Sequence, residues 1–442
     1  NFGLQKFRID YEGTKNLVDE IIKHGYDHHI NPEYIEISFG NECQFKCGYC
    51  HPKASSAWQK EMSQGPLENA KHLQVLEEKI YPEDENPYVD AFWKWWPDMY
   101  KTLRVFRMTG GEPLMDKNTF KVMEYVLENP NKDLELSITT NMCPVNDVLF
   151  ERFIGLLKQL DNVEHSAEVY VPDPYDGTDW QTWDHYIIGA DAKRYHDSEL
   201  PSIEREEIKQ TFLQVGQCEE QGDNSYTYEY KYNDKAYHNF SVFVSLDGWG
   251  QQAEYIRHGM NFDKVWNNVN RFLDETHHTS INFINTFNCL SLPSLREFLE
   301  GVLQLRKKWN KSVQYALGWE TPEQRIWFDI PLLRNPAWQS IQILPDDYQD
   351  YMLEAIDFME QNKANEEFVD YEGFKDFEIE KVKRNLEHMK KELSRDKLLR
   401  DRADFSKFFN EHDRRRGTDF LATFPEMSQF WFMCEEAEAI YE

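Results

Sequence analysis

Three closely spaced cysteines, Cys43, Cys47 and Cys50, are the residues of this sequence with the clearest chemical potential. Their C-x3-C-x2-C spacing follows a short alternating apolar segment at residues 34 to 39. Soft thiolate ligands select iron-sulfur clusters or zinc, so one loop with three thiols can hold one inorganic cluster. Three ligands are one short of four, and an open coordination position is typical of a catalytic metal site rather than a closed structural one.

Other chemistry is compatible with the same loop. Residues 47 to 51 read C-G-Y-C-H, which is formally the attachment signature of c-type haem. With His51 as a fourth ligand, the three cysteines could instead close a zinc site. The thiols could also be buried side chains without a chemical role. The loop favours the iron-sulfur interpretation and leaves these three alternatives open.

A second motif follows a predicted strand at residues 103 to 108. It consists of a turn with Gly110, Gly111 and Glu112, which Pro113 terminates. Glycine allows the backbone to approach a ligand closely, and proline fixes the direction in which the chain leaves the turn. A pair of glycines in a turn is weak evidence by itself, and it gains meaning from its place after the cysteine loop.

Strand and helix signals alternate around both motifs. Strands are predicted at residues 134 to 141, 240 to 248, 280 to 288 and 312 to 318, and helices at residues 116 to 129, 146 to 160 and 294 to 309. This alternation predicts parallel βα units. Polar residues end several of the strands, which is where α/β barrels place their active sites.

The cysteine loop, with Tyr49 before its third cysteine, and the Gly-Gly-Glu-Pro turn together resemble the radical S-adenosylmethionine (SAM) superfamily. The resemblance covers roughly residues 30 to 320 and implies a partial (β/α)6 barrel. It also implies one [4Fe-4S] cluster on the three cysteines, whose open iron chelates SAM. An electron from the cluster then cleaves SAM to a 5'-deoxyadenosyl radical, which abstracts hydrogen from a substrate.

The same resemblance implies which residues contact SAM. These are Tyr49 beside the cluster, Gly110, Gly111 and Glu112 at the methionine amino group, Asn141 at the end of the third strand, Ser245 near the ribose and Arg257 at the SAM carboxylate. Arginine is the usual bidentate partner of a carboxylate, so the chemistry agrees with the last assignment. The alternative is an exposed arginine on a helix turn.

The chain divides into a cap at residues 1 to 33, the barrel at 34 to 320 and a mainly helical extension at 321 to 442. An insertion at about 163 to 237, rich in tyrosine and aspartate, is predicted to recognise the substrate, with a solvated decoration as the alternative. The extension resembles twitch-type radical SAM proteins. It departs from their pattern because Cys434 is its single cysteine, too few for an auxiliary cluster.

The four remaining cysteines, Cys143, Cys218, Cys289 and Cys434, are scattered along the chain and are predicted to be buried thiols. Some radical SAM epimerases use a lone cysteine as a hydrogen-atom donor. By this resemblance Cys218, Cys289 and Cys434 are candidates for that role.

Composition limits the partners. The formal net charge of −30 disfavours binding to a long nucleic acid, because such binding requires cationic surface. No apolar run of eighteen residues and no signal-peptide core are visible, so we predict a cytoplasmic protein. The resemblance implies flavodoxin or ferredoxin as the electron donor. The run at residues 414 to 416, three arginines, could dock such an acidic donor, but a solvated charge run is favoured.

The sequence therefore predicts a radical SAM enzyme, and the twitch-like extension favours a peptide or protein side chain as its substrate. A nucleotide or another small metabolite is the alternative substrate. From a different class, the rival is a zinc-binding structural or interaction protein. A degenerate barrel that binds SAM without radical chemistry is a third possibility.

Overall fold

The computed structural model describes residues 19, 21–25, 31–65, 67, 86–131, 134–161, 240–276, 279–317, 325–365 and 372–441, and the backbone of five strands between residues 166 and 231. For residue 161 and residues 310–317 it describes the backbone alone. Most of the predicted N-terminal cap lies outside these ranges.

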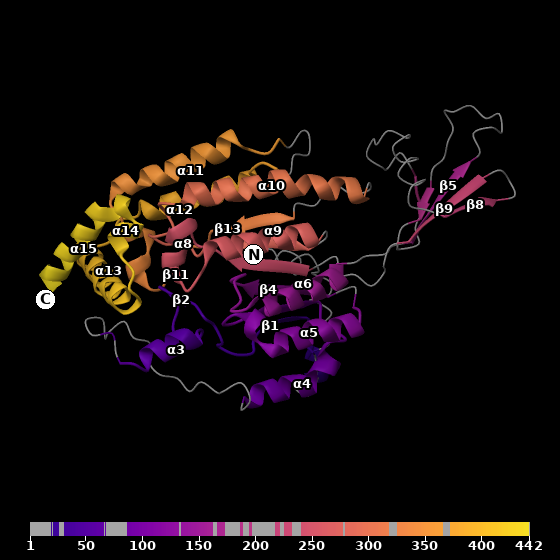
Figure 1. Cartoon of the computed structure of the whole chain (residues 1–442), viewed down its shortest axis with the longest axis horizontal. Coiled ribbons are helices and arrows are strands. Elements are labelled where there is room, and N and C mark those ends of the chain that lie inside the picture. Colours follow the sequence, from indigo (N-terminus) through magenta and orange to yellow (C-terminus); the bar gives the residue numbers. More distant parts are fainter. Residues whose placement is uncertain are drawn as a thin grey trace.

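Six strands form a central parallel sheet (Figure 1). They pair in the order β1 (Tyr34–Ser38), β3 (Val105–Thr109), β4 (Glu135–Thr140), β10 (Phe240–Ser245), β12 (Ser280–Ile284) and β13 (Ile326–Asp329). Strand order follows chain order, and every neighbouring pair is parallel. The predicted α/β class with parallel strands is therefore confirmed. Among the described strands the sheet is open, with β1 and β13 at its edges.

The sixth strand was predicted at the wrong place. Residues 312–317 belong to α10 (Leu295–Leu317), and the last strand of the sheet is β13, beyond the predicted barrel boundary at residue 320. No glycine or proline interrupts the chain between residues 302 and 317, so the helix has no signal to stop before Gly318. A short alternating apolar pattern cannot be told from the end of such a helix by periodicity alone.

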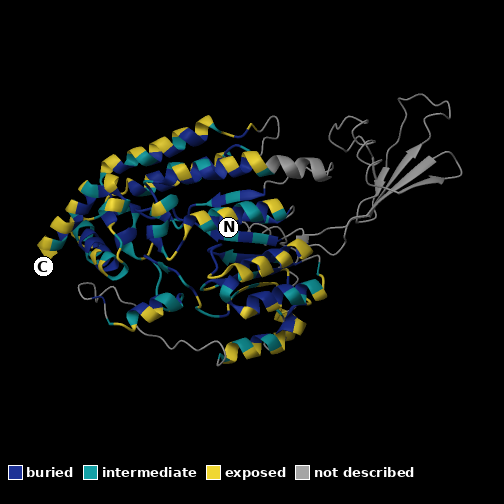
Figure 2. Cartoon of the chain, in the orientation of Figure 1, coloured by how far each residue is buried: buried dark blue, intermediate teal, exposed yellow. Residues whose placement is uncertain are grey.

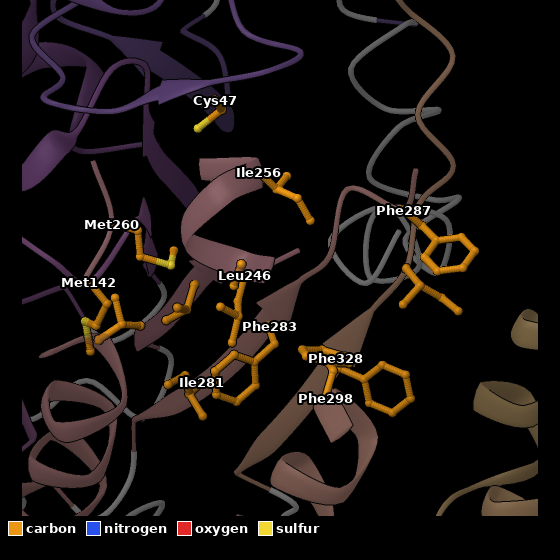
Figure 3. Packing of buried hydrophobic residues seen from close by; sticks show 14 of the residues in the cluster. Cys47, Met142, Leu246, Ile256, Met260, Ile281, Phe283, Phe287, Phe298 and Phe328 are labelled. Atoms are coloured by element: carbon orange, nitrogen blue, oxygen red, sulfur yellow. The ribbon is translucent and has the colours of Figure 1, made fainter. Parts of the chain in front are cut away.

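Helices cover one face of the sheet. They include α4 (Pro87–Met99), α5 (Lys117–Glu128), α6 (Asp147–Asp161), α9 (Phe262–Glu275) and α10. Trp96 of α4 packs on Phe106 of β3 with ring centroids 4.8 Å apart, and Phe298 of α10 packs edge-on against Phe283 of β12 at 6.3 Å. Figure 3 shows Phe283 and Ile281 together in this cluster, and Figure 2 shows the buried residues on the inward sides of the helices.

Between α6 and β10 the chain forms a second, antiparallel sheet. Its strand order is β7 (Arg194–His196), β6 (Tyr186–Ile188), β5 (Ser166–Pro172), β9 (Ser225–Lys231) and β8 (Gln217–Gln221). The insertion predicted at 163 to 237 thus has strands of its own. Its side chains lie outside the described residues, so its role in substrate recognition stays a prediction.

The C-terminal extension is helical, as predicted. Its helices are α11 (Gln349–Gln361), α12 (Asp376–Met389), α13 (Arg395–Arg416), α14 (Phe420–Thr423) and α15 (Ser428–Tyr441). A buried ion pair of 2.6 Å between Arg306 of α10 and Glu378 of α12 joins the extension to the helices of the central sheet. No helix among the described residues is sufficiently long and apolar to span a membrane.

Candidate functional site

The cysteine loop starts where β1 ends and is held by two short strands. Cys43 lies in the loop, Cys47 ends β2 (Lys46–Cys47), and Cys50 follows. β2 pairs antiparallel with β11 (Arg257–His258), and this register sets Arg257 opposite Cys47. All three cysteines have free thiols. The three predicted cluster ligands therefore lie together at the carboxyl end of the sheet.

Burial controls the protonation of these thiols. It raises the pKa of Cys43 to about 12, and it also raises the pKa of Cys47 and Cys50. The nearby Arg257 opposes the shift at Cys47 because its positive charge favours a thiolate. Since a thiolate is the metal-binding form, a cationic metal centre at these side chains would have to displace their protons.

In the described part of the chain, no group of three Cys, His, Asp or Glu side chains is arranged to hold one metal ion. The buried Nδ1 of His51 has no hydrogen-bond partner. A zinc site with His51 as the fourth ligand stays a prediction.

The two glycines of the second motif make room for the cysteine loop. Gly110 has φ +118°, a conformation that favours glycine. A Cβ at Gly110 would clash with Ser38, and one at Gly111 would overlap the backbone of Glu42. The Glu112 N–H then donates to the Glu42 carbonyl at 2.6 Å. The glycines were expected to bring the backbone close to a ligand; here they also let the two motifs touch.

Glu112 is a buried acid fixed by three donors. Its Oε1 accepts from the Thr140 hydroxyl at 2.6 Å and the Leu114 N–H at 3.0 Å, and its Oε2 accepts from the Asn141 N–H at 2.6 Å. Burial nevertheless raises the pKa of Glu112 to about 7. A buried carboxylate of this kind gains most from a cationic ligand, such as an ammonium group.

Asn141 brings a third predicted residue to the same edge. Its Oδ1 accepts from the Cys143 N–H at 2.9 Å, while its Nδ2 is buried without a hydrogen-bond partner. The Cys143 carbonyl in turn accepts from Gln44 of the cysteine loop at 2.5 Å. An unpaired buried donor is costly, so the Asn141 amide nitrogen is a candidate hydrogen-bond donor to a polar ligand beside Glu112.

Tyr49, Asp247 and Arg257 form one buried network beside Cys47. The Arg257 Nε pairs with Asp247 at 2.7 Å, its Nη2 donates to the Tyr49 hydroxyl at 2.6 Å, and its Nη1 approaches the Cys47 sulfur at 3.8 Å. The Tyr49 hydroxyl donates to Asp247. The alternative of an exposed Arg257 is wrong, because the residue is buried. Its contact with a SAM carboxylate stays a prediction.

Two residues of the site, Asp247 and Asn285, were not predicted from the sequence. Asp247 receives the Thr286 N–H at 2.7 Å and so links the ends of β10 and β12. Asn285, just after β12, is fully buried, and neither atom of its side-chain amide has a hydrogen-bond partner. Both residues lie near the carboxyl end of a predicted strand, and this position is the sequence feature that could have indicated them. Ser245, the predicted ribose contact, ends β10 and is half-buried.

The C-terminal extension contacts the cysteine loop through Arg416. The Arg416 Nη1 donates to the Lys46 carbonyl at 2.9 Å, and its guanidinium lies 4.6 Å from the centre of the Trp58 ring. Trp58, in α3 (Ser56–Met62), donates to the Cys47 carbonyl at 2.9 Å. Figure 1 shows β2 and β11 between the sheet and the C-terminal helices.

The burial of Arg416 shows that the prediction of a solvated arginine run at residues 414 to 416 is wrong for this residue. Its side chain is 0% exposed and pairs with Glu61 at 3.2 Å, whereas Arg414 of the same run is 57% exposed. Arg415 pairs with Glu411 at 2.6 Å. The run therefore joins the extension to the cysteine loop instead of forming one solvated patch.

The remaining cysteines belong to other segments of the chain than the cysteine loop. Cys143, Cys289 and Cys434 are buried, as predicted, and burial raises the pKa of each thiol. Cys434 lies in α15, and Cys289 follows β12. The side chain of Cys218 lies outside the described residues. A role for Cys218, Cys289 or Cys434 as hydrogen-atom donor stays a prediction.

The sequence relatives of this chain include GTP 3',8-cyclases. No family model matches the chain. The GTP 3',8-cyclase of Picosynechococcus is 26% identical over 192 residues, which are 40% of this chain and 51% of the relative. That of Desulforamulus reducens is 27% identical over 152 residues, 34% of this chain and 38% of the relative. The chain thus spans about half, or less, of the curated relatives it matches. This similarity supports the resemblance to the radical SAM superfamily.

Solved structures give weaker matches. The crystal structure of Streptococcus suis SuiB bound to S-adenosylmethionine has 11% identity and a TM-score of 0.38, over 80% of this chain and 53% of that chain. SuiB bound to the precursor peptide SuiA has 11% identity and a TM-score of 0.33, over 66% and 41% of the two chains.

Proposed function

We propose that this protein is a radical SAM enzyme with one [4Fe-4S] cluster on Cys43, Cys47 and Cys50. One observation carries the proposal: the cysteine loop and the Gly-Gly-Glu-Pro turn, far apart in sequence, meet at the carboxyl end of one parallel sheet through the hydrogen bond from Glu112 to Glu42. The sequence similarity to GTP 3',8-cyclases supports it.

The chain supplies binding and orientation, and the cofactors supply the reactive chemistry. When bound, the cluster would deliver the electron that cleaves SAM and so produces the group that abstracts hydrogen from the substrate. Glu112 and the free Asn141 amide offer an acid and a donor for the amino acid part of SAM. Arg257 and Tyr49 hold a positive charge and a hydroxyl beside Cys47.

The test is anaerobic reconstitution with iron and sulfide, followed by dithionite and SAM, with iron, sulfide and 5'-deoxyadenosine measured together. We expect about four irons per chain and formation of 5'-deoxyadenosine. Cys47→Ala should abolish both. Cys289→Ala is the matched control, because Cys289 is a buried thiol outside the loop, and it should retain the cluster. One zinc per chain and no 5'-deoxyadenosine would overturn the proposal.

For the substrate we propose a peptide or protein side chain, which the resemblance of the extension to twitch-type proteins supports. The second candidate is a nucleotide, because the sequence relatives are named GTP 3',8-cyclases. If GTP is the substrate, adding it to the reduced enzyme should consume GTP in step with 5'-deoxyadenosine formation. Unchanged GTP would exclude this candidate.

A further inference from the structure

The two faces of the central sheet differ in chemistry. Parallel sheets with helices on both faces are normally built from near-continuous apolar strands. Here the strands alternate: Phe106, Ile138 and Val244 are fully buried in the hydrophobic core, while the intervening positions Arg107, Thr139 and Ser245 are half-buried and polar. One face therefore packs on helices, and the other presents polar groups.

The strand register places these groups in two short, staggered rows. Glu36 pairs with Arg107, whose partner on β4 is Ser137; Phe243 pairs with both Thr139 and Asn282, and Asn282 pairs with Trp327. Two side-chain contacts join the rows on one face of the sheet, because Arg107 reaches both Thr139 and Phe243. We call this set the polar row; its members are Glu36, Arg107, Thr139, Phe243, Asn282 and Trp327.

Arg107 is the centre of the row. Its guanidinium lies 4.4 Å from the centre of the Phe243 ring, and its Nη2 donates to the Thr139 hydroxyl at 3.2 Å. Its Nε is buried without a hydrogen-bond partner, and the nearest Glu36 oxygen is 3.9 Å away. The side chain is still 30% exposed. These contacts hold the Arg107 side chain in one orientation and leave some of its N–H groups available to a ligand.

A second, independent observation points to a ligand. Asn282 is nine-tenths buried, and its Oδ1 has no hydrogen-bond partner. Leaving a buried carbonyl oxygen unpaired is costly, so a site of this kind normally receives a donor from a ligand or a water molecule. Asn282 belongs to the polar row with Arg107 and lies three strands further along the sheet.

The polar row lies within reach of the cysteine loop. It precedes the strand ends, Ser38 and Ser245, by two residues, which is roughly 7 Å at the rise of a β-strand. At the β13 end of the polar row, α12 packs against the strand. Phe377 packs on Trp327 with ring centroids 6.3 Å apart, and Lys381 pairs with Asp329. A ligand on the row would therefore extend toward the site at the strand ends.

We propose that the polar row binds the substrate and that Arg107 recognises a single carboxylate of a peptide, such as a glutamate side chain. That this ligand is the substrate rests on the proposed function. The six described strands contribute one cation, Arg107, and Glu36 lies beside it. A row with no net positive charge does not suit a nucleoside triphosphate, whereas one arginine fork matches one carboxylate.

The test measures binding without SAM or a reductant, so it does not depend on radical chemistry. The probes are N-acetylglutamate methylamide and its neutral isostere N-acetylglutamine methylamide, titrated into the protein by ligand-observed NMR. We expect the glutamate probe to bind more tightly. Arg107→Gln should weaken its binding about 10- to 100-fold, and Arg107→Lys should weaken it less, since lysine keeps the charge without the fork.

Two further variants make the test specific. Arg104→Gln is the matched control, because Arg104 precedes the same strand and is exposed; it should bind the glutamate probe like the wild type. Glu36→Gln changes an exposed side chain and removes the charge that competes for Arg107, so it should tighten binding of the glutamate probe. This last result does not depend on whether Arg107→Gln folds.

Three results would overturn the inference. They are equal binding of the two probes to the wild type, no tightening in Glu36→Gln, and GTP binding that is tighter than the glutamate probe and is lost in Arg107→Gln. Failure of the proposed function has a different signature. In that case the wild type would form no 5'-deoxyadenosine on reconstitution, while the response of the glutamate probe to Glu36→Gln would persist.

Discussion

Arg416→Gln should destabilise the protein and loosen the cysteine loop. The Arg416 guanidinium is fully buried and pairs with Glu61, a side chain 7% exposed. Removing one partner of a buried ion pair costs about 3–5 kcal/mol. Glu61 keeps Lys46, whose Nζ lies 2.6 Å away, so we expect the lower end, about 3 kcal/mol of unfolding free energy.

Urea unfolding of the cluster-free protein, followed by tryptophan fluorescence, measures this loss. Arg414→Gln is the matched control. It removes an arginine from the same helix turn, but Arg414 is mostly exposed, and such a pair contributes at most about 1 kcal/mol. Alkylation of Cys47 should also become faster in Arg416→Gln, because Arg416 packs on Trp58, which bonds the Cys47 carbonyl.

A double-mutant cycle with Glu61→Gln separates the ion pair from general packing. A pair in direct contact should give a coupling energy of about 0.5–3 kcal/mol. Equal losses in the Arg416 and Arg414 variants, or a coupling energy near zero, would refute the conclusion that this buried pair joins the extension to the loop.

Three other perturbations test the site. Gly111→Ala should lower the iron bound per chain after reconstitution, because its Cβ overlaps the Glu42 backbone; Gly155→Ala, in open space on α6, should not. Burial raises the Glu112 pKa from 4.5 to about 7, so its ionisation destabilises the folded state as pH rises through that window. In urea unfolding, the free energy of unfolding of Glu112→Gln minus that of the wild type should be larger at pH 8 than at pH 4. His412 is a buried residue of α13 in the C-terminal extension. Burial lowers its pKa from 6.5 to about 4, so stability is lost as pH falls between these values, and His412→Gln should flatten this acid loss in thermal melting.

Short sequence motifs predicted many of the residues that the structure brings together in the candidate site. The thiol spacing of Cys43, Cys47 and Cys50 and the glycine turn before Glu112 are patterns that a sequence displays directly. Strand alternation then implied that the ends of neighbouring parallel strands share one edge, and the structure brings Asn141 to Glu112 at that edge. The SAM contacts predicted for Ser245, Arg257 and the other residues of the site all stay predictions.

Contacts between distant segments were not visible in the sequence. Residues 312–318 alternate like a strand, yet residues 312–317 continue α10, because helix continuation competes with a weak period-two pattern. The three arginines at residues 414 to 416 are chemically identical in sequence, and one of them alone is fully buried. Its partner, Glu61, is 355 positions away along the chain.

The sequence by itself determined the chemistry available to this protein: three thiols in one loop, a glycine turn with an acid, and alternating strands and helices. These features depend on residues that are neighbours in the chain. Only the tertiary structure decided which charges are buried, which polar atoms lack partners, and that the C-terminal extension supports the cysteine loop. Burial and pairing are set by packing between segments far apart in sequence, and no local pattern encodes them.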